Sequence, residues 1–354
     1  MAKKTERLKL GAKPLKNRQK YLICRVVLTR HLFNSRIIIN KVKENTNKEQ
    51  NMKPTINPNI SIIGVALDLG AGTPGVSLGP SAIRYAGIAE KLMKIGYDVK
   101  DEGDIAANRP LSPLTDGVKL RFLDEVTRVN TELCNKVSKV MDEGRFPLVL
   151  GGDHSIAIGS IAGVSRHKKN LGVIWFDAHG DINTEETSPS GNIHGMPVAV
   201  SLGLGHERLT SIGGSYKKIQ PDKFVYIGCR DLDAGERKVL KELGITVFTM
   251  HEVDRYGMTY ITEQAIKIAG EGTDGIHVSF DLDSLDPIYV QGTGTRVPGG
   301  LTYREGNLAL EMIALSEKLV SAEFVEVNPI IDYKNSTAEI AVSLMGSLLG
   351  EWLI

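Results

Sequence analysis

Three side chains that bind metal ions occupy alternate positions in the segment WFDAHGD, residues 175–181. Alternate side chains of an extended chain lie on one face, so Asp177, His179 and Asp181 are expected to point the same way. A single triplet of this kind can arise by chance. Its meaning depends on whether other parts of the chain carry matching ligands.

Similar polar residues follow other apolar runs. His154 lies in GGDHS after residues 146–150, and Asp281 and Asp283 lie in SFDLD. Taken singly, each has an ordinary structural explanation, such as a helix cap or a turn. Several carboxylates and imidazoles at the ends of neighbouring strands would instead repel one another unless cations neutralise them. The pattern therefore favours a metal site.

The ligand types indicate which metal. Two imidazoles and four carboxylates, without a thiolate, are too rich in oxygen for structural zinc and too rich in imidazole for calcium. They suit manganese, with cobalt, iron or nickel as substitutes. Such a set suffices for two ions if Asp177 and Asp281 bridge, and two ions can share a hydroxide nucleophile. The expected ligands are His154, Asp177, His179, Asp181, Asp281 and Asp283.

Apolar runs alternate with stretches of helical spacing from residue 59 onward. This alternation indicates a parallel sheet covered by helices on both faces. Ligands of such sheets bind beyond the carboxyl ends of the strands, where the polar motifs lie. No repeat or linker interrupts the pattern, so residues 52–354 are predicted to form a single α/β domain. The expected strands are 60–69, 146–153, 171–181, 224–232, 245–250, 276–283 and 324–329, and the expected helices are 80–96, 119–143, 155–168, 234–243, 257–270, 303–319 and 335–350.

The composition is that of a soluble globular protein. Of 354 residues, 42% are hydrophobic and 24% charged. No apolar run approaches the roughly 18 residues of a membrane span. Cys24, Cys134 and Cys229 are few and widely spaced, which indicates a reducing compartment rather than a disulfide framework. We expect a cytoplasmic protein with neither a membrane nor a nucleic-acid partner.

Residues 1–51 differ from the rest in charge. They hold nine Lys and five Arg against three Glu, a formal charge of +11, which leaves −10 for residues 52–354. A nucleic-acid-binding tail and a transit peptide are two explanations, and the first lacks a known motif. A third is a start codon assigned too early, because Lys48-Glu49 can be encoded by AAGGAG, which resembles a bacterial ribosome-binding site ahead of Met52. We favour the third and expect residues 1–51 to lie outside the fold.

Four motifs, GGDHS, FDAHGD, SFDLD and EVNP, resemble in order and spacing the ureohydrolases, the family of arginases and agmatinases. The resemblance covers roughly residues 59–354. It implies a three-layer α/β/α fold with a mainly parallel central sheet and a binuclear manganese cluster, which hydrolyses guanidinium groups to urea and an amine. By resemblance, one ion is held by His154, Asp177, Asp181 and Asp281, and the other by Asp177, His179, Asp281 and Asp283.

Within that family the arginases are the nearest likeness, and Gly180 and HGMP (194–197) resemble the Bacillus-type branch. The loop DINTEETSPSGNIHG (181–195) resembles the arginase loop that reads the α-carboxylate and α-amino groups, of which agmatine lacks the carboxylate. The resemblance implies hydrolysis of L-arginine to L-ornithine and urea by a metal-bridging hydroxide, in a homo-oligomer that is a trimer or hexamer. The implied substrate-binding residues are Asn183, Ser190, Asn192, Asp233, Thr295 and Glu326.

Three residues are expected to take part in the chemistry. Glu326 would hold the guanidinium by a charge-assisted pair and fix its carbon near the nucleophile. Asp181 would stabilise the tetrahedral intermediate together with the metals. His194 occupies the place of the family's proton shuttle, although a histidine that merely bonds its own loop is a common alternative.

One loop departs from the family pattern. After DLDSLDP it reads IYVQGTGTRVPGG, with Gln291 and Arg296 where prolines are usual. Both changes loosen a segment that is expected to border the active site through Thr295, and Arg296 adds a cation near a cationic substrate. Two alternatives therefore stay open: an agmatinase or other guanidino-acid hydrolase, and a weakly active paralogue that binds arginine or metal.

Overall fold

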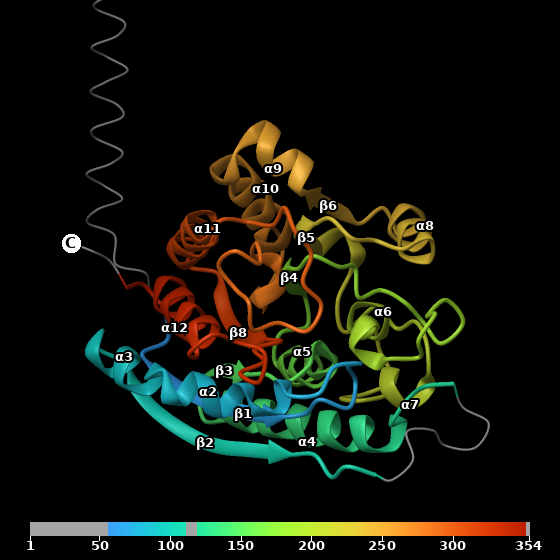
Figure 1. The fold of residues 1–354 in the computed structure, drawn as a ribbon, viewed down its shortest axis with the longest axis horizontal. Coiled ribbons are helices and arrows are strands. Elements are labelled where there is room, and N and C mark those ends of the chain that lie inside the picture. Colours follow the sequence, from blue (N-terminus) through green and yellow to red (C-terminus); the bar gives the residue numbers. More distant parts are fainter. Residues whose placement is uncertain (1–55, 111–118, 352–354) are drawn as a thin grey trace, which may run out of the picture. The chain divides into compact units, whose positions relative to one another are not determined.

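A computed structural model describes residues 56–110 and 119–351 of the chain, and these belong to one compact unit. Its centre is an eight-stranded sheet in the order β2-β1-β3-β8-β7-β4-β5-β6, in which every neighbouring pair is parallel (Figure 1). The strands are β1 (Asn59–Ala66), β2 (Asp98–Ala106), β3 (Phe146–Leu150), β4 (Leu171–Phe176), β5 (Phe224–Cys229), β6 (Thr246–Thr249), β7 (Gly275–Asp281) and β8 (Leu319–Val325).

Helices cover both faces of the sheet, so the predicted three-layer α/β/α architecture is confirmed (Figure 1). One hydrophobic cluster joins the sheet to α2 (Gly79–Tyr85), α3 (Ile88–Lys94), α9 (Met250–Tyr256), α10 (Met258–Gly270), α11 (Tyr303–Leu315) and α12 (Ser336–Leu348). The other joins it to α4 (Leu123–Asp142), α5 (Ala157–Ser165), α6 (Pro197–Ser201), α7 (Glu207–Thr210) and α8 (Ala234–Leu243).

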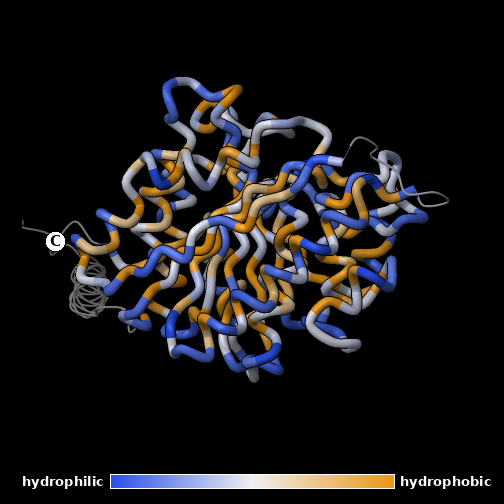
Figure 2. The backbone as a smooth tube through the Cα atoms, turned by 90° about the horizontal axis from the view of Figure 1, so that it is seen from below, coloured by the Kyte–Doolittle hydropathy of each residue, from blue (hydrophilic) through white to orange (hydrophobic). Residues whose placement is uncertain are grey.

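Strands β3, β4 and β5 are apolar on both faces because both faces are covered. In β4, Val173 and Trp175 belong to one cluster, whereas Ile174 and Phe176 belong to the other. Figure 2 shows the same distribution along the backbone, with hydrophobic segments running through the interior and hydrophilic ones in the outer turns. Six of the seven predicted strands coincide with observed strands, which confirms that continuous apolar runs mark buried parallel strands. The seventh, predicted at 324–329, shares only its first two residues with β8, because Ser321 and Glu323 interrupt the apolar run in the first part of that strand.

The edge strand β2 was not predicted. Its sequence, DVKDEGDIA, is mostly charged, and only Ile105 is fully buried. Charged residues are a common way to protect a sheet edge from pairing with another chain, and they remove the apolar signal. The expected helix 80–96 is divided into α2 and α3 at Gly87, which has a positive φ of 88°.

Two further expectations concern residues 1–51 and the absence of a membrane span. The expectation that residues 1–51 lie outside the fold falls outside the described residues. Within the described ranges, no helix is both long enough and apolar enough to cross a membrane.

Candidate metal centre and active site

The expected metal ligands lie at the carboxyl ends of three strands near the middle of the sheet. His154 follows β3, Asp177 and His179 follow β4, Asp281 ends β7, and Asp283 lies in the turn directly after it. Between β3 and β7 in the sheet lies β8, which is followed directly by Glu326. Residues separated by more than a hundred positions therefore meet at one edge, as expected for a parallel sheet.

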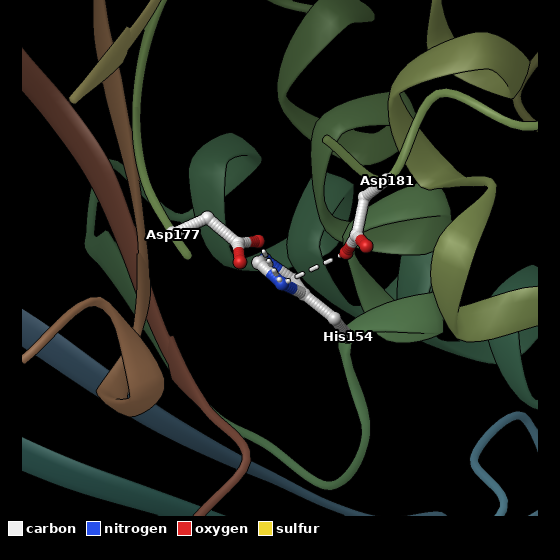
Figure 3. Close-up of side chains that lie close together, drawn as sticks. All are labelled: His154, Asp177 and Asp181. Carbon is white, nitrogen blue, oxygen red and sulfur yellow. Dashed lines mark ion pairs between the residues drawn. The ribbon is translucent and has the colours of Figure 1, made fainter. Parts of the chain in front are cut away.

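The first group centres on the imidazole of His154. Its Nδ1 lies 3.1 Å from Asp177 Oδ2, 3.2 Å from Asp181 Oδ2 and 3.1 Å from an Asp281 oxygen. Figure 3 shows the ring between the first two of these carboxylates. Although buried, Nδ1 makes no hydrogen bond. An imidazole nitrogen surrounded by three carboxylate oxygens fits a cation, which would bond to all four atoms.

The second group centres on His179. Its Nδ1 lies 3.4 Å from Asp177 Oδ1 and 3.2 Å from Asp283 Oδ2. Asp177 therefore directs one oxygen to each histidine, as a bridging carboxylate would. The outer oxygens of Asp177 and Asp281 each accept a backbone N–H two residues further on, at 2.8 Å and 2.7 Å, but only Asp177 also contacts His179. The contacts thus link Asp177 to both groups and Asp281 to the first.

The electrostatics of the centre reflect an excess of acid. Burial and the neighbouring Asp177 raise the pKa of Asp181 to about 6. Burial and the carboxylates of Asp283 and Asp177 raise the pKa of Asp281 well above its usual range. Burial disfavours charged His179, but Asp283 and Asp177 more than offset this and raise its pKa. Divalent cations would remove this repulsion.

Trp175 contacts His154 and Asp177 of the first group, and it was not selected from the sequence. Its ring stacks on His154 with centroids 4.1 Å apart and planes 8° apart. Its indole N–H donates to Asp177 Oδ2 at 2.8 Å. In the sequence, a tryptophan within an apolar strand is expected to be an ordinary core residue. The only indication of these contacts is its position two residues before Asp177, which places both side chains on the same face of the strand.

Two of the acidic residues adopt a left-handed backbone conformation that non-glycine residues rarely use. Asp181 has a φ of 48° and Glu326 a φ of 65°. Each position costs about 1–2 kcal/mol relative to the right-handed region. Such strain is characteristic of functional sites, where the surrounding structure maintains it.

Glu326 and His194 lie together at the side of the centre. His194 Nδ1 is 3.5 Å from Glu326 Oε1, the oxygen that also accepts the backbone N–H of His154 at 2.9 Å. Burial disfavours the charged imidazole, but Glu326 more than offsets this and raises the pKa of His194 to about 9. His194 is therefore held at its ring by Glu326 and at its backbone by Gly70, whose carbonyl accepts the His194 N–H at 3.1 Å.

A cavity of about 260 Å³ borders these residues. Every expected substrate-binding residue except Glu326 lines it, and Glu326 adjoins it through His194. Glu236, which sequence reasoning did not select, lines it too, and burial raises its pKa to about 7. The lining residues are His179, Asp181, Asn183, Ser188, Pro189, Ser190, Asn192, His194, Gly195, Asp231, Asp233, Glu236, Asp281 and Thr295.

Hydrogen bonds order the far wall of the cavity. Asn183 Nδ2 donates to Asp233 Oδ2 at 2.9 Å, and Thr187 donates to Asn183 Oδ1 at 2.8 Å. Asp233 also caps α8 by accepting the N–H of Glu236 at 2.8 Å, in a reciprocal capping box. Asn192 Oδ1 is buried without a hydrogen-bond partner. A polar atom of this kind is suited to a polar ligand.

The unusual loop reaches the centre through one contact. Thr295 donates its hydroxyl to Asp283 Oδ2 at 2.8 Å. Gln291 and Arg296 are exposed, and neither lines the cavity. The hypothesis that Arg296 adds a cation to the substrate pocket is therefore not supported by its position.

Comparisons with known proteins agree on one family. Residues 58–350 match the model described as the arginase family. An arginase from Brevibacillus brevis is 56% identical over 299 residues, which are 84% of this chain and all of the relative. The native structure of Bacillus caldovelox arginase has a TM-score of 0.81 at 57% identity and covers 86% of this chain and 100% of its own. Entamoeba histolytica arginase in complex with L-ornithine has a TM-score of 0.75 at 38% identity, with 83% of this chain and 99% of that chain covered.

Proposed function

Because this chain belongs to the arginase family, we propose that it hydrolyses L-arginine to L-ornithine and urea with the help of two manganese ions. The observation that carries the proposal is the pair of histidine–carboxylate groups that share Asp177 and lie beside the cavity. His154, Asp177, Asp181 and Asp281 would hold one ion, and Asp177, His179, Asp281 and Asp283 the other. When bound, a manganese pair supplies a water nucleophile that is activated at neutral pH.

Glu326 would bind the guanidinium group of the substrate. Its Oε1 is occupied by the His154 N–H, and no hydrogen bond within the described residues uses Oε2. A carboxylate oxygen fixed in this way can accept two N–H groups of a guanidinium and neutralise its charge. Because the side chain is 2% exposed, the pair would form away from bulk water, where it also fixes the position of the guanidinium carbon.

His194 would supply the proton that the leaving amine needs. A pKa of about 9 keeps the imidazole protonated at neutral pH, and the residue lines the cavity. A positioned acid of this kind increases the rate by about 10²–10⁴-fold. Asp181, on the same wall, would accept a hydrogen bond from the tetrahedral intermediate.

The polar wall favours arginine over agmatine. Asn183, Ser190 and Asn192 offer amide and hydroxyl donors suited to an α-carboxylate, and Asp233 offers an acceptor for an α-ammonium group. Agmatine has no carboxylate, so its binding would leave these donors unpaired, at a cost of about 1–3 kcal/mol for each group that water cannot reach.

A urea assay tests the substrate directly. Purified protein with added Mn²⁺ is given L-arginine, agmatine or 4-guanidinobutyrate in parallel, and urea is measured. Urea is expected from L-arginine only. Urea from agmatine or 4-guanidinobutyrate would establish the alternative of an agmatinase or other guanidino-acid hydrolase. Binding of L-arginine with little or no turnover would establish the weakly active paralogue.

We further propose that the protein works as a homo-oligomeric cytoplasmic enzyme, a trimer or hexamer, and that residues 52–354 are its single domain. Cys134 and Cys229 are buried free thiols, which is in keeping with a reducing compartment. A chain that starts at Met52 should retain the oligomeric mass, melting temperature and urea production of the full chain. A loss of any of these would show that residues 1–51 contribute to the enzyme.

A further inference from the structure

A stripe of polar residues runs through the core between β7 and β8. His277 lies opposite Ser321, and Ser279 lies opposite Glu323, so all four side chains share one face of the sheet. Each is at most 1% exposed, and none lines the active-site cavity. The neighbouring positions on that face are apolar core. A carboxylate inside such a core demands an explanation.

The stripe connects to the metal centre by hydrogen bonds. Glu323 accepts the Ser160 hydroxyl of α5 at 2.5 Å through one oxygen and the Ser279 hydroxyl at 2.8 Å through the other. Ser279 Oγ is in turn 2.8 Å from Nε2 of His154. His277 Nε2 lies 3.3 Å from Glu323, and its Nδ1 is 2.8 Å from Ser321.

The number of protons available in the chain from Glu323 through Ser279 to His154 determines which group donates each hydrogen bond. An ionised Glu323 can only accept, so Ser279 must donate its one hydroxyl proton to it. The Ser279 oxygen can then only accept from His154, which places a proton on His154 Nε2. A neutral imidazole protonated there has its lone pair on Nδ1, the atom that faces Asp177, Asp181 and Asp281. The buried carboxylate therefore selects the form of His154 that can bind a metal.

We propose that Glu323 is a positioning residue that acts through Ser279 to hold His154 in its metal-binding form and so sets the affinity of the first manganese site. The inference rests on the proposed manganese function. Partners that orient a histidine ligand in this way strengthen metal binding by about 10–100-fold. The polar stripe is thus an outer support of the centre, reached through the core rather than through the cavity.

A purely structural role for Glu323 leads to different results. If the carboxylate served only to join β7, β8 and α5, its loss would lower stability and leave the affinity for metal unchanged. Apart from His277, no basic side chain among the described residues pairs with Glu323. An isosteric glutamine keeps the volume of the side chain and one acceptor oxygen, so it should not destabilise the fold greatly.

The test uses Glu323→Gln and Ser279→Ala, with Ser321→Ala as the matched control. Ser321 is an equally buried serine of the same stripe, but it contacts His277 and not His154. Each full-length protein is stripped of metal, its melting temperature is measured, and Mn²⁺ is titrated by calorimetry. We expect both test variants to bind one of the two ions about 10–100-fold more weakly than the wild type and the control, with Glu323→Gln keeping its metal-free melting temperature.

Three results would count against the proposal. Wild-type affinity in Ser279→Ala or in Glu323→Gln would overturn it, and so would an equal loss in the Ser321→Ala control. If the wild-type protein itself failed to bind Mn²⁺, the proposed function would fall, and the positioning role would fall with it. Because the wild type is titrated beside the variants, the two failures are distinguishable.

Discussion

Arg230 offers the sharpest test of how the unusual loop is held. This side chain follows β5, and its guanidinium donates to backbone carbonyls on both sides of the loop that carries Thr295. The shortest bonds are those to Val297 at 2.6 Å and to Asp283 at 2.7 Å. All five acceptors are the carbonyl oxygens of Gly228, Asp283, Ser284, Leu285 and Val297. One guanidinium thus fixes both the predicted metal ligand Asp283 and the loop whose Thr295 donates a hydrogen bond to it.

Replacing Arg230 by Met removes all of these donors. Hydrogen bonds to a charged group contribute about 1.5–3 kcal/mol each. Burial opposes the charge and lowers the pKa of Arg230. We therefore count about 0.5–1 kcal/mol for each of the six bonds and expect a loss of about 3–6 kcal/mol. Since about 1 kcal/mol moves the melting temperature of a large domain by roughly 2–4 °C, the shift should be on the order of 10 °C.

Thermal unfolding and manganese dependence together form the assay. Arg230→Lys is the matched variant, because an ammonium keeps the charge but cannot reach all five carbonyls at once, and it should lose about half as much. Both variants should require more Mn²⁺ for half-maximal urea production, since Asp283 and Thr295 are no longer held in register. A Met variant that melts within about 2 °C of the wild type and needs no more manganese would refute the reasoning.

Three further predictions concern single side chains at or near the cavity. Glu326→Gln should reduce both arginine binding and turnover, whereas His194→Asn should leave binding intact and lower turnover by about 10²–10⁴-fold; an equal loss of binding in both would contradict this division. Because the pKa of Glu236 rises from its ordinary 4.5 to about 7, its proton is held more tightly in the folded state, so stability falls as the pH rises through that window. Glu236→Gln, which preserves the capping box, should therefore stabilise the metal-free protein by about 3 kcal/mol at pH 8 and leave its stability unchanged at pH 4. A gain in stability that does not depend on pH would show that ionisation of Glu236 is not its cause. Arg296→Pro should stabilise the protein by about 0.4–1 kcal/mol, because no hydrogen bond within the described residues uses the Arg296 N–H. It should leave the KM for arginine unchanged, because the Arg296 side chain is exposed. A lower KM in an Arg296→Ala control would show that the charge reaches the substrate.

Much of the fold could be predicted from local sequence patterns, and the parts that could not be predicted have a physical reason. Runs such as LGVIWF in β4 are apolar at every position because both faces are covered, which makes them visible in one dimension. The edge strand β2 has a solvated face and a charged sequence, so it carried no such signal. The strand order depends on long-range pairing between β3, β8 and β7, which no local pattern records.

The candidate site likewise contains residues that local sequence could predict and residues that it could not. Its ligands could be proposed because each follows an apolar run, and strand ends meet at one edge in a parallel sheet. Trp175, Arg230 and Glu323 were missed, because their roles depend on partners from other strands. Glu323 shows this most clearly, since the segment SAEFVEVNP does not reveal that its first carboxylate is fully buried opposite Ser279.

The central claim is that this chain hydrolyses arginine with two metal ions held at the end of the sheet. It is tested most directly by titrating Mn²⁺ into exhaustively chelated protein while counting bound metal and measuring the urea released from L-arginine. We expect no urea from the metal-free chain and full activity at two bound ions per chain. Urea production that survives complete chelation, or that reaches its maximum with a single bound ion, would contradict it.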